Sequence, residues 1–254
     1  MRKRTDNPLQ QRSVLIATAA RVLSQLRHDG RSVALILGAP VLLLGLLSWV
    51  LSGQPGVFDE WGALLLGVFP LLLMFVVTSV ATLRERSGGT LERLVTMPMS
   101  KIDFLGGYGL AFGVAAVLQA LIASALTFSV FGLTIAAPVG SVVLIAVLNA
   151  LLGTSLGLFA SAFASTEFQA VQMLPMLLLP QFLLCGIISP TSSMPQLLEW
   201  ISTVLPMTYS VDAMKQLTIQ SEVTGEVWRD IGVLVGFIFA FLAAGASTLK
   251  RRTP

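Results

Sequence analysis

Few side chains in this sequence could do acid–base, metal or redox chemistry, and they are scattered along the chain. His28 is the only histidine and Cys185 the only cysteine, so neither a Cys/His metal cluster nor an internal disulfide is available. His28 lies in a basic amphipathic stretch, where we expect a solvated imidazole rather than a ligand or base. The sequence has neither a GxxxxGK[ST] phosphate loop nor an HExxH motif, so it has no route to ATP hydrolysis or zinc proteolysis by these motifs.

Two glycine patterns carry structural rather than chemical information. Gly107, Gly109 and Gly113 superficially resemble a dinucleotide-binding loop, but the spacing is wrong and no strand precedes them. We therefore expect them to allow close helix packing. Gly153 and Gly157 form a GxxxG pattern, which also predicts a close approach of two helices, within one chain.

Neutral polar residues inside long apolar runs are the candidate substrate-contacting groups. They are Gln119, Asn149, Gln172 and Gln181. They indicate either hydrogen bonds between helices or a path for an amphiphilic substrate. No carboxylate pair lies in these runs, and we expect the spans to hold no ionisable side chain. That pattern disfavours an intramembrane hydrolase and a proton-coupled transporter.

The elements that must position these residues are membrane helices. Of 254 residues, 55% are hydrophobic and 11% are charged, with a mean hydropathy of +0.84. A soluble domain carries about twice that charged fraction. Several runs reach the ~20 apolar residues that a helical span needs, without the alternation of a membrane barrel. The prediction is an all-α membrane protein with six transmembrane helices, an N-terminal amphipathic interfacial helix and short re-entrant helices between spans 5 and 6.

The chain is expected to divide into three parts. Residues 1–31 form a cytoplasmic tail with an amphipathic helix at 13–28, which either lies in the membrane interface or packs on other cytosolic helices. Residues 32–249 form the transmembrane domain, and 250–254 a cytoplasmic tail. The spans are predicted at about 32–52, 61–83, 104–131, 139–162, 168–189 and 231–249.

Residues 190–230 differ from the spans around them. Pro190, Pro195 and Pro206 interrupt apolar pieces that are too short to cross a bilayer. We interpret this segment as helices that enter the outer leaflet and return, with an ordinary surface loop as the alternative.

The positive charge decides the orientation. Of the sixteen Lys and Arg residues, fourteen fall on the side of the termini, and only Lys215 and Arg229 fall on the other. The positive-inside rule then predicts that both termini are cytoplasmic in a multi-pass protein of the cell inner (plasma) membrane.

A charged insert between spans 2 and 3 is the candidate docking surface for a soluble partner. Its residues are Glu85, Arg86, Gly88, Gly89, Thr90, Leu91, Glu92, Arg93 and Leu94. The paired glycines allow a sharp turn, and the threonine can cap a short helix with an apolar face. The alternative is a solvated interfacial loop.

Two stretches together resemble the ABC-2 type transporter permeases, in particular the daunorubicin-resistance-like drug and lipid exporters. The first is this insert with Pro98 and Ser100 after it, although Ser87 adds a residue to the usual pattern. The second, after span 5, runs from Gly186 through Pro190, Pro195, Pro206, Tyr209 and Asp212 to Lys215, which stands where Arg is usual. With the span layout, the resemblance covers nearly the whole chain.

The resemblance implies a non-catalytic subunit of an exporter. Its partners would be two cytosolic ATPase subunits, which hold ATP and Mg, a second permease that is identical or paralogous, and membrane lipids, but no nucleic acid. This chain itself would bind no cofactor. The insert would couple it to the ATPase, and Pro190, Pro195, Pro206, Tyr209, Asp212 and Lys215 would form the exterior gate. The main alternative is a secondary transporter or channel that works without ATP; a membrane-embedded enzyme and a structural membrane protein are further alternatives.

Overall fold

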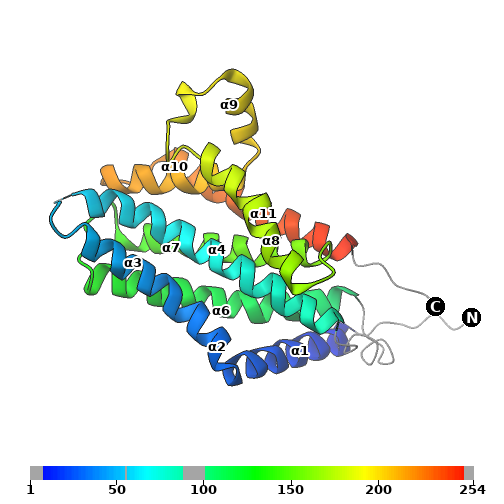
Figure 1. Cartoon of the computed structure of the whole chain (residues 1–254). Coiled ribbons are helices and arrows are strands. Elements are labelled where there is room, and N and C mark those ends of the chain that lie inside the picture. Colours follow the sequence, from blue (N-terminus) through cyan, green and yellow to red (C-terminus); the bar gives the residue numbers. More distant parts are fainter. Residues whose placement is uncertain (1–7, 55, 88–100, 249–254) are drawn as a thin grey trace, which may run out of the picture.

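The computed structural model describes residues 8–54, 56–87 and 101–248, and within these ranges the chain is helical and without strands (Figure 1). The elements are α1 (Pro8–His28), α2 (Gly30–Val33), the π-helix η1 (Ala34–Gly38), α3 (Ala39–Val50), α4 (Val57–Ser87), α6 (Lys101–Ser129), α7 (Val139–Ser161), α8 (Glu167–Leu184), the 3-10 helix η2 (Thr191–Ser193), α9 (Gln196–Thr203), α10 (Pro206–Ile219) and α11 (Gly225–Thr248). The all-α prediction is confirmed.

Within the described residues, five helices are long and apolar enough to cross a membrane: Gly30–Val50, Val57–Glu85, Gly106–Ser129, Val139–Ser161 and Gly225–Thr248. They correspond to five of the six predicted spans. The remaining predicted span, span 5 at about 168–189, falls on α8, which has 18 residues, or about 27 Å at the α-helical rise. α8 holds three glutamines and two prolines and does not belong to the five. The six-span count is therefore not confirmed.

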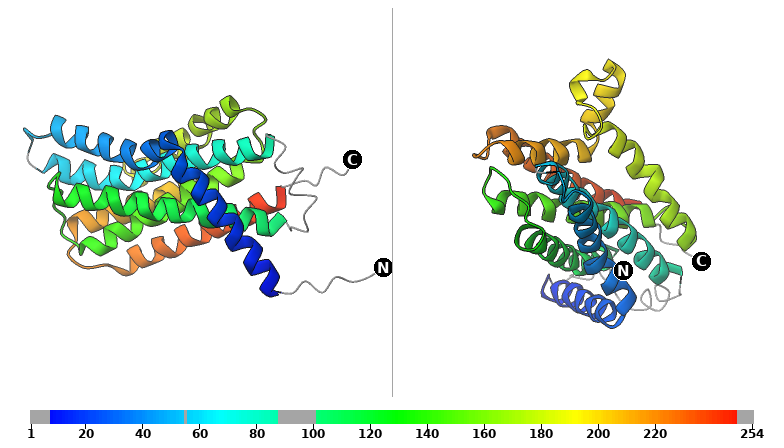
Figure 2. Two further views of the ribbon diagram at one scale, coloured as in Figure 1. Left: turned by 90° about the horizontal axis from the view of Figure 1, so that it is seen from below. Right: turned by 60° about the vertical axis from the view of Figure 1, so that its left-hand side comes forward.

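The long helices α3, α4, α6, α7 and α11 run side by side along one direction (Figures 1 and 2). The closest approach in the bundle is that of α4 and α7 at the two glycines of the GxxxG pattern. A Cβ on Gly157 would lie 2.7 Å from the carbonyl oxygen of Phe75, and one on Gly153 would overlap the backbone of Leu71. The predicted close packing within the chain is confirmed, because only glycine lets the two backbones meet here.

Helix α1 crosses α6 obliquely, at one end of the bundle (Figure 2). It packs where α6 lacks side chains: a Cβ on Gly107 would lie 2.7 Å from the Cβ of Thr18. The prediction of close helix packing is thus confirmed at Gly107, whereas a Cβ on Gly109 or Gly113 would make ordinary contacts, of 3.6 and 3.5 Å. The helix begins earlier than expected, at Pro8, and ends as predicted before Asp29, whose carboxylate accepts hydrogen bonds from the Arg31 amide and the Ser32 hydroxyl.

Different helix ends and turns lie at the two ends of the bundle (Figure 1). The C-terminal end of α4, the start of α6 and the last turn of α11 lie together at one end, and the turns after α3, α6 and α10 lie at the other. At that second end, the Asp59 carboxylate accepts a hydrogen bond from the Thr134 amide, and the amide of Ala137 donates to the carbonyl of Leu217. The end with the C-terminus of α4 is called the insert end below, and the end with the turns after α3, α6 and α10 is called the loop end.

Candidate functional site

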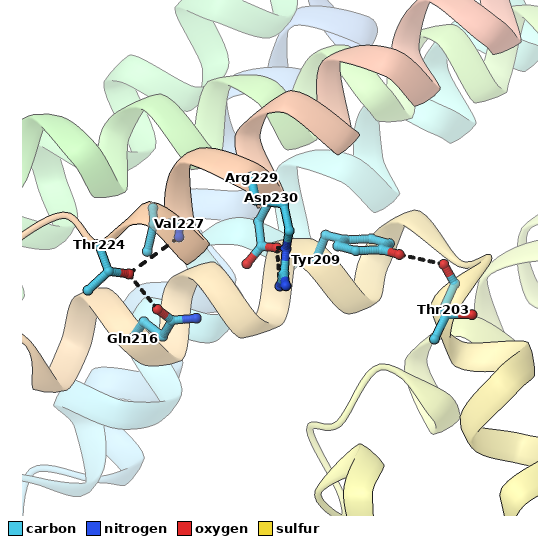
Figure 3. Close-up of polar contacts among 7 residues, drawn as sticks. All are labelled: Thr203, Tyr209, Gln216, Thr224, Val227, Arg229 and Asp230. Atoms are coloured by element: carbon cyan, nitrogen blue, oxygen red, sulfur yellow. Dashed lines mark hydrogen bonds and ion pairs between the residues drawn. The ribbon is translucent and has the colours of Figure 1, made fainter.

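The predicted gate residues assemble around α10. Pro190 and Pro195 precede η2 and α9 directly, and Pro206 is the first residue of α10, where its missing amide costs no helical hydrogen bond. The Tyr209 hydroxyl donates to the carbonyl of Thr203 at 2.6 Å and so fixes the α9–α10 turn (Figure 3). α9 otherwise stands clear of the bundle (Figure 1).

α10 is anchored to the core by Asn149 of α7. The Asn149 amide donates a hydrogen bond to the hydroxyl of Ser210, and both side chains are buried. Gly67 of α4 makes room for this pair, because a Cβ there would lie 2.9 Å from Asn149 Nδ2. Asn149 was predicted as a substrate-path residue; the contact observed is one between helices, and a role in substrate contact stays a prediction.

Lys215 of α10 contacts the backbone just after the C-terminal end of α8. Its ammonium donates a hydrogen bond to the carbonyl of Gly186, which has a φ of +89°. A Cβ built on Gly186 would lie 3.9 Å from both Lys215 Nζ and Asp212 Oδ1, so these two side chains reach the same point of the backbone. A cation beside the last carbonyls of a helix is electrostatically favourable.

Asp230 of α11 is the most deeply buried acidic residue of the site. Its side chain is 0% exposed, and Oδ1 accepts hydrogen bonds from Arg229 Nη2 at 2.9 Å and Nε at 3.1 Å (Figure 3). Oδ2 has no hydrogen-bond partner among the described residues. On the facing helix α10, burial and then the negative charge of Asp230 raise the pKa of Asp212. Asp212, Lys215, Arg229 and Asp230 are called the charge cluster below.

The sequence analysis missed Asp230. Span 6 was expected to begin at 231, with no ionisable residue inside it, whereas the spanning helix begins at Gly225 and includes Asp230. The missed signal was local: Thr224 is a good N-cap residue, and its hydroxyl accepts from the Val227 amide while donating to Gln216 Oε1 at 2.8 Å (Figure 3).

A row of aromatic rings leads away from the charge cluster. The centroids of Tyr209 and Phe237 lie 6.4 Å apart, those of Phe237 and Phe241 6.0 Å, and those of Phe241 and Phe159 5.8 Å. Phe163 ends the row, 5.1 Å from Phe159 and at the insert end of α7. The row therefore connects the gate helix α10 with the opposite end of the molecule.

At the insert end, α8 is tied to α4. The guanidinium of Arg84 donates two hydrogen bonds, of 2.7 and 2.8 Å, to the two carboxylate oxygens of Glu167. These bonds lower the pKa of Glu167. Thr166 caps α8 beside it, accepting from the Gln169 amide.

Of the predicted coupling residues, only the Glu85 side chain is described by the structure. It lies 3.8 Å from Arg21 of α1, which also donates a hydrogen bond of 3.2 Å to the Tyr108 hydroxyl of α6. Arg86 is in the last turn of α4, and its side chain lies outside the described part. Gly88, Gly89, Thr90, Leu91, Glu92, Arg93 and Leu94 also lie outside the described residues, so their coupling role stays a prediction.

The other predicted substrate-path residues are spread over two helices. Gln119 of α6 is buried, and its amide has no partner among the described residues. Gln181 of α8 is buried and donates to the carbonyl of Leu177 in its own helix at 3.0 Å. Gln172 is exposed. A common path through these residues stays a prediction.

The fold and the site define a multi-pass helical membrane protein whose helix α10 is tied to the bundle by polar contacts. Its sequence identifies the family. Residues 13–219 match the model of the ABC-2 type transporter family, and the chain belongs to that family.

Curated relatives carry the names of transport permeases. The probable multidrug ABC transporter permease YbhR of Escherichia coli K12 is 28% identical over 191 residues, which cover 74% of this chain and 51% of YbhR. The inner membrane transport permease YhhJ of Escherichia coli K12 is 28% identical over 171 residues, or 67% of this chain and 46% of YhhJ. The linearmycin resistance permease protein LnrN of Bacillus subtilis 168 is 23% identical over 180 residues, or 71% and 46%. The chain thus spans about half the length of these relatives.

Proposed function

We propose that this chain is the transmembrane permease subunit of an ABC exporter, which moves a hydrophobic or amphiphilic molecule out of the cell. Separate cytosolic ATPase subunits, which bind ATP and Mg, would drive it, while this chain contributes no catalytic residue. Family membership and the names of the relatives YbhR, a probable multidrug permease, and LnrN, a linearmycin resistance permease, support the substrate class. A second permease, identical or paralogous, would complete the translocation path.

The observation that carries the proposal is the attachment of α8 at both of its ends. Glu167 at the start of α8 pairs with Arg84, the residue directly before the coupling insert. The carbonyl of Gly186, after the end of α8, accepts a hydrogen bond from Lys215 of the gate helix. A push on the insert therefore reaches α10 through one helix. Pro175 and Pro180 inside α8 remove backbone hydrogen bonds and are the points where this helix can bend.

The proposed topology follows the predicted one. α8 makes the sixth crossing, and α9 and α10 enter the outer leaflet and return. The excess of Lys and Arg at the insert end supports a cytoplasmic position for both termini in the inner membrane. ATP-driven movement of the insert then switches the bundle between two arrangements, with α10 and α9 opening or closing the exterior side.

Reconstitution with the partner ATPase tests the proposal. The ATPase should copurify with the chain, and substrate should be exported only with ATP. Combined charge reversal, Glu92→Arg with Arg93→Glu, should abolish export and leave membrane insertion unchanged. Normal export by this variant would show that Glu92 and Arg93 do not couple the chain to the ATPase. Transport that runs on an ion gradient without any ATPase would establish the alternative, a secondary transporter, for which the buried Asp230 is the supporting observation.

A further inference from the structure

Burying the carboxylate of Asp230 costs free energy. A carboxylate inside a membrane helix is costly unless it is fully paired, and such residues mark binding sites and pathways. Asp230 is 0% exposed and belongs to the spanning helix Gly225–Thr248. Arg229 satisfies Oδ1, while Oδ2 finds no partner among the described residues. The buried acid therefore retains one free acceptor.

The surrounding charges leave a negative excess. The charge cluster itself is neutral when Asp212, Lys215, Arg229 and Asp230 are all ionised, and the exposed Glu226, one turn before Asp230 on α11, adds one negative charge. The ammonium of Lys215 is directed at the Gly186 carbonyl, and the Arg229 side chain is 62% exposed. One monovalent cation would balance the group.

Aromatic side chains lie further along the face of α11 that carries Asp230. Asp230, Leu234, Phe237 and Phe241 follow one another at helical spacing on α11 and so share one face of it. Tyr209 of α10 meets this face through Phe237, and its ring lies beside the Arg229–Asp230 pair (Figure 3). Aromatic faces attract organic cations and also pack against apolar groups.

We propose that Asp230 binds the positively charged group of an amphiphilic organic cation whose apolar part packs on Tyr209, Phe237 and Phe241. The inference rests on the proposed export function and names the substrate class of the same chain. Access requires α10 to move away from α11, and this movement breaks the hydrogen bond from Thr224 to Gln216 and the one from Asn149 to Ser210. The cation then takes the place of Arg229, which turns outward to water.

Equilibrium binding to the purified full chain in lipid nanodiscs tests this. Tetraphenylphosphonium is the probe, and tetraphenylborate, which has the same shape and the opposite charge, is its control. The phosphonium should bind, and Asp230→Asn should weaken its binding by about tenfold or more. Glu222→Gln, which removes an exposed carboxylate from the neighbouring loop, should leave the affinity unchanged.

A second variant is expected to change the phosphonium affinity in the opposite direction. Arg229→Gln removes the competing cation and should tighten phosphonium binding severalfold, so the inference stays testable if Asp230→Asn does not fold. Equal binding of phosphonium and borate, or unchanged affinities in both Asp230→Asn and Arg229→Gln, would overturn it. Binding at equilibrium needs no ATPase. Loss of ATP-driven export with intact phosphonium binding would therefore count against the exporter proposal alone.

Discussion

Arg84 near the end of α4 holds Glu167 at the start of α8 by two parallel hydrogen bonds of 2.7 and 2.8 Å. The two side chains are 59% and 51% exposed, so water screens the pair strongly. We expect the pair to add little to the stability of the fold. Its importance is that it joins α4, the helix before the insert, to α8, the helix that contacts α10.

A charge swap tests that position. Arg84→Glu and Glu167→Arg should each impair export, since each places two like charges at the joint, and the double swap should recover much of it. The free energy of unfolding should change by no more than about 1 kcal/mol in any of the three, as for other exposed ion pairs. ATP-driven export and thermal unfolding, measured on the same preparations, separate the two effects. Equal impairment in the double swap would contradict the linkage.

The same pair predicts a pH dependence. Because the hydrogen bonds from Arg84 lower the pKa of Glu167, its contribution to stability is complete above the unfolded-state pKa of about 4.3. It is lost as the pH falls through the lower pKa of the folded state. The difference in unfolding temperature between the native chain and Glu167→Gln should hold from pH 7 to about pH 5 and vanish at lower pH. A difference that vanishes near pH 6.5 would point to another titrating group.

Local patterns in the sequence predicted most of the bundle, because an apolar run long enough to cross a membrane is itself local information. The GxxxG pattern likewise predicted a close approach at Gly153 and Gly157. It did not identify α4 as the partner, since that depends on which helices become neighbours in space. The same reasoning predicted α8 as a span at about 168–189, and a helix forms over Glu167–Leu184, but its glutamines and prolines lower its apolarity and its ends are tied by contacts to Arg84 and Lys215.

The site was harder to predict than the bundle. Its key contacts join residues far apart in the sequence, such as Asn149 with Ser210 and Lys215 with Gly186. The sequence singled out Asn149 and Lys215 but could not identify the groups that they contact. Asp230 was assigned to the segment before the last span, because the sequence alone does not show that α11 begins at Gly225 and buries this carboxylate.

The α4–α7 contact predicts the effect of adding one methyl group. Gly153→Ala should destabilise the fold by about 1–3 kcal/mol, because the new Cβ overlaps the backbone of Leu71 and the helices must separate. Gly140→Ala in the same helix is the matched control, since no described atom lies within 4 Å of a Cβ there. Thermal unfolding in detergent measures both. Equal unfolding temperatures for the two variants would show that the helix contact is looser than observed.

The link between Lys215 and Gly186 predicts how readily the gate opens. Lys215→Met leaves the Gly186 carbonyl without its donor, which costs about 1–3 kcal/mol, whereas Lys215→Arg keeps a donor in reach. Cys185, the only cysteine of the chain, is 0% exposed beside this carbonyl and reports opening through its rate of labelling by a maleimide. Lys215→Met should label about tenfold faster than the native chain, because labelling requires local opening, and Lys215→Arg should label at the native rate. Lys215→Met combined with Cys185→Ser supplies the background. If the Met and Arg variants label at the same rate, the hydrogen bond does not hold α8 against α10, and the path from the insert to the gate must run through other contacts.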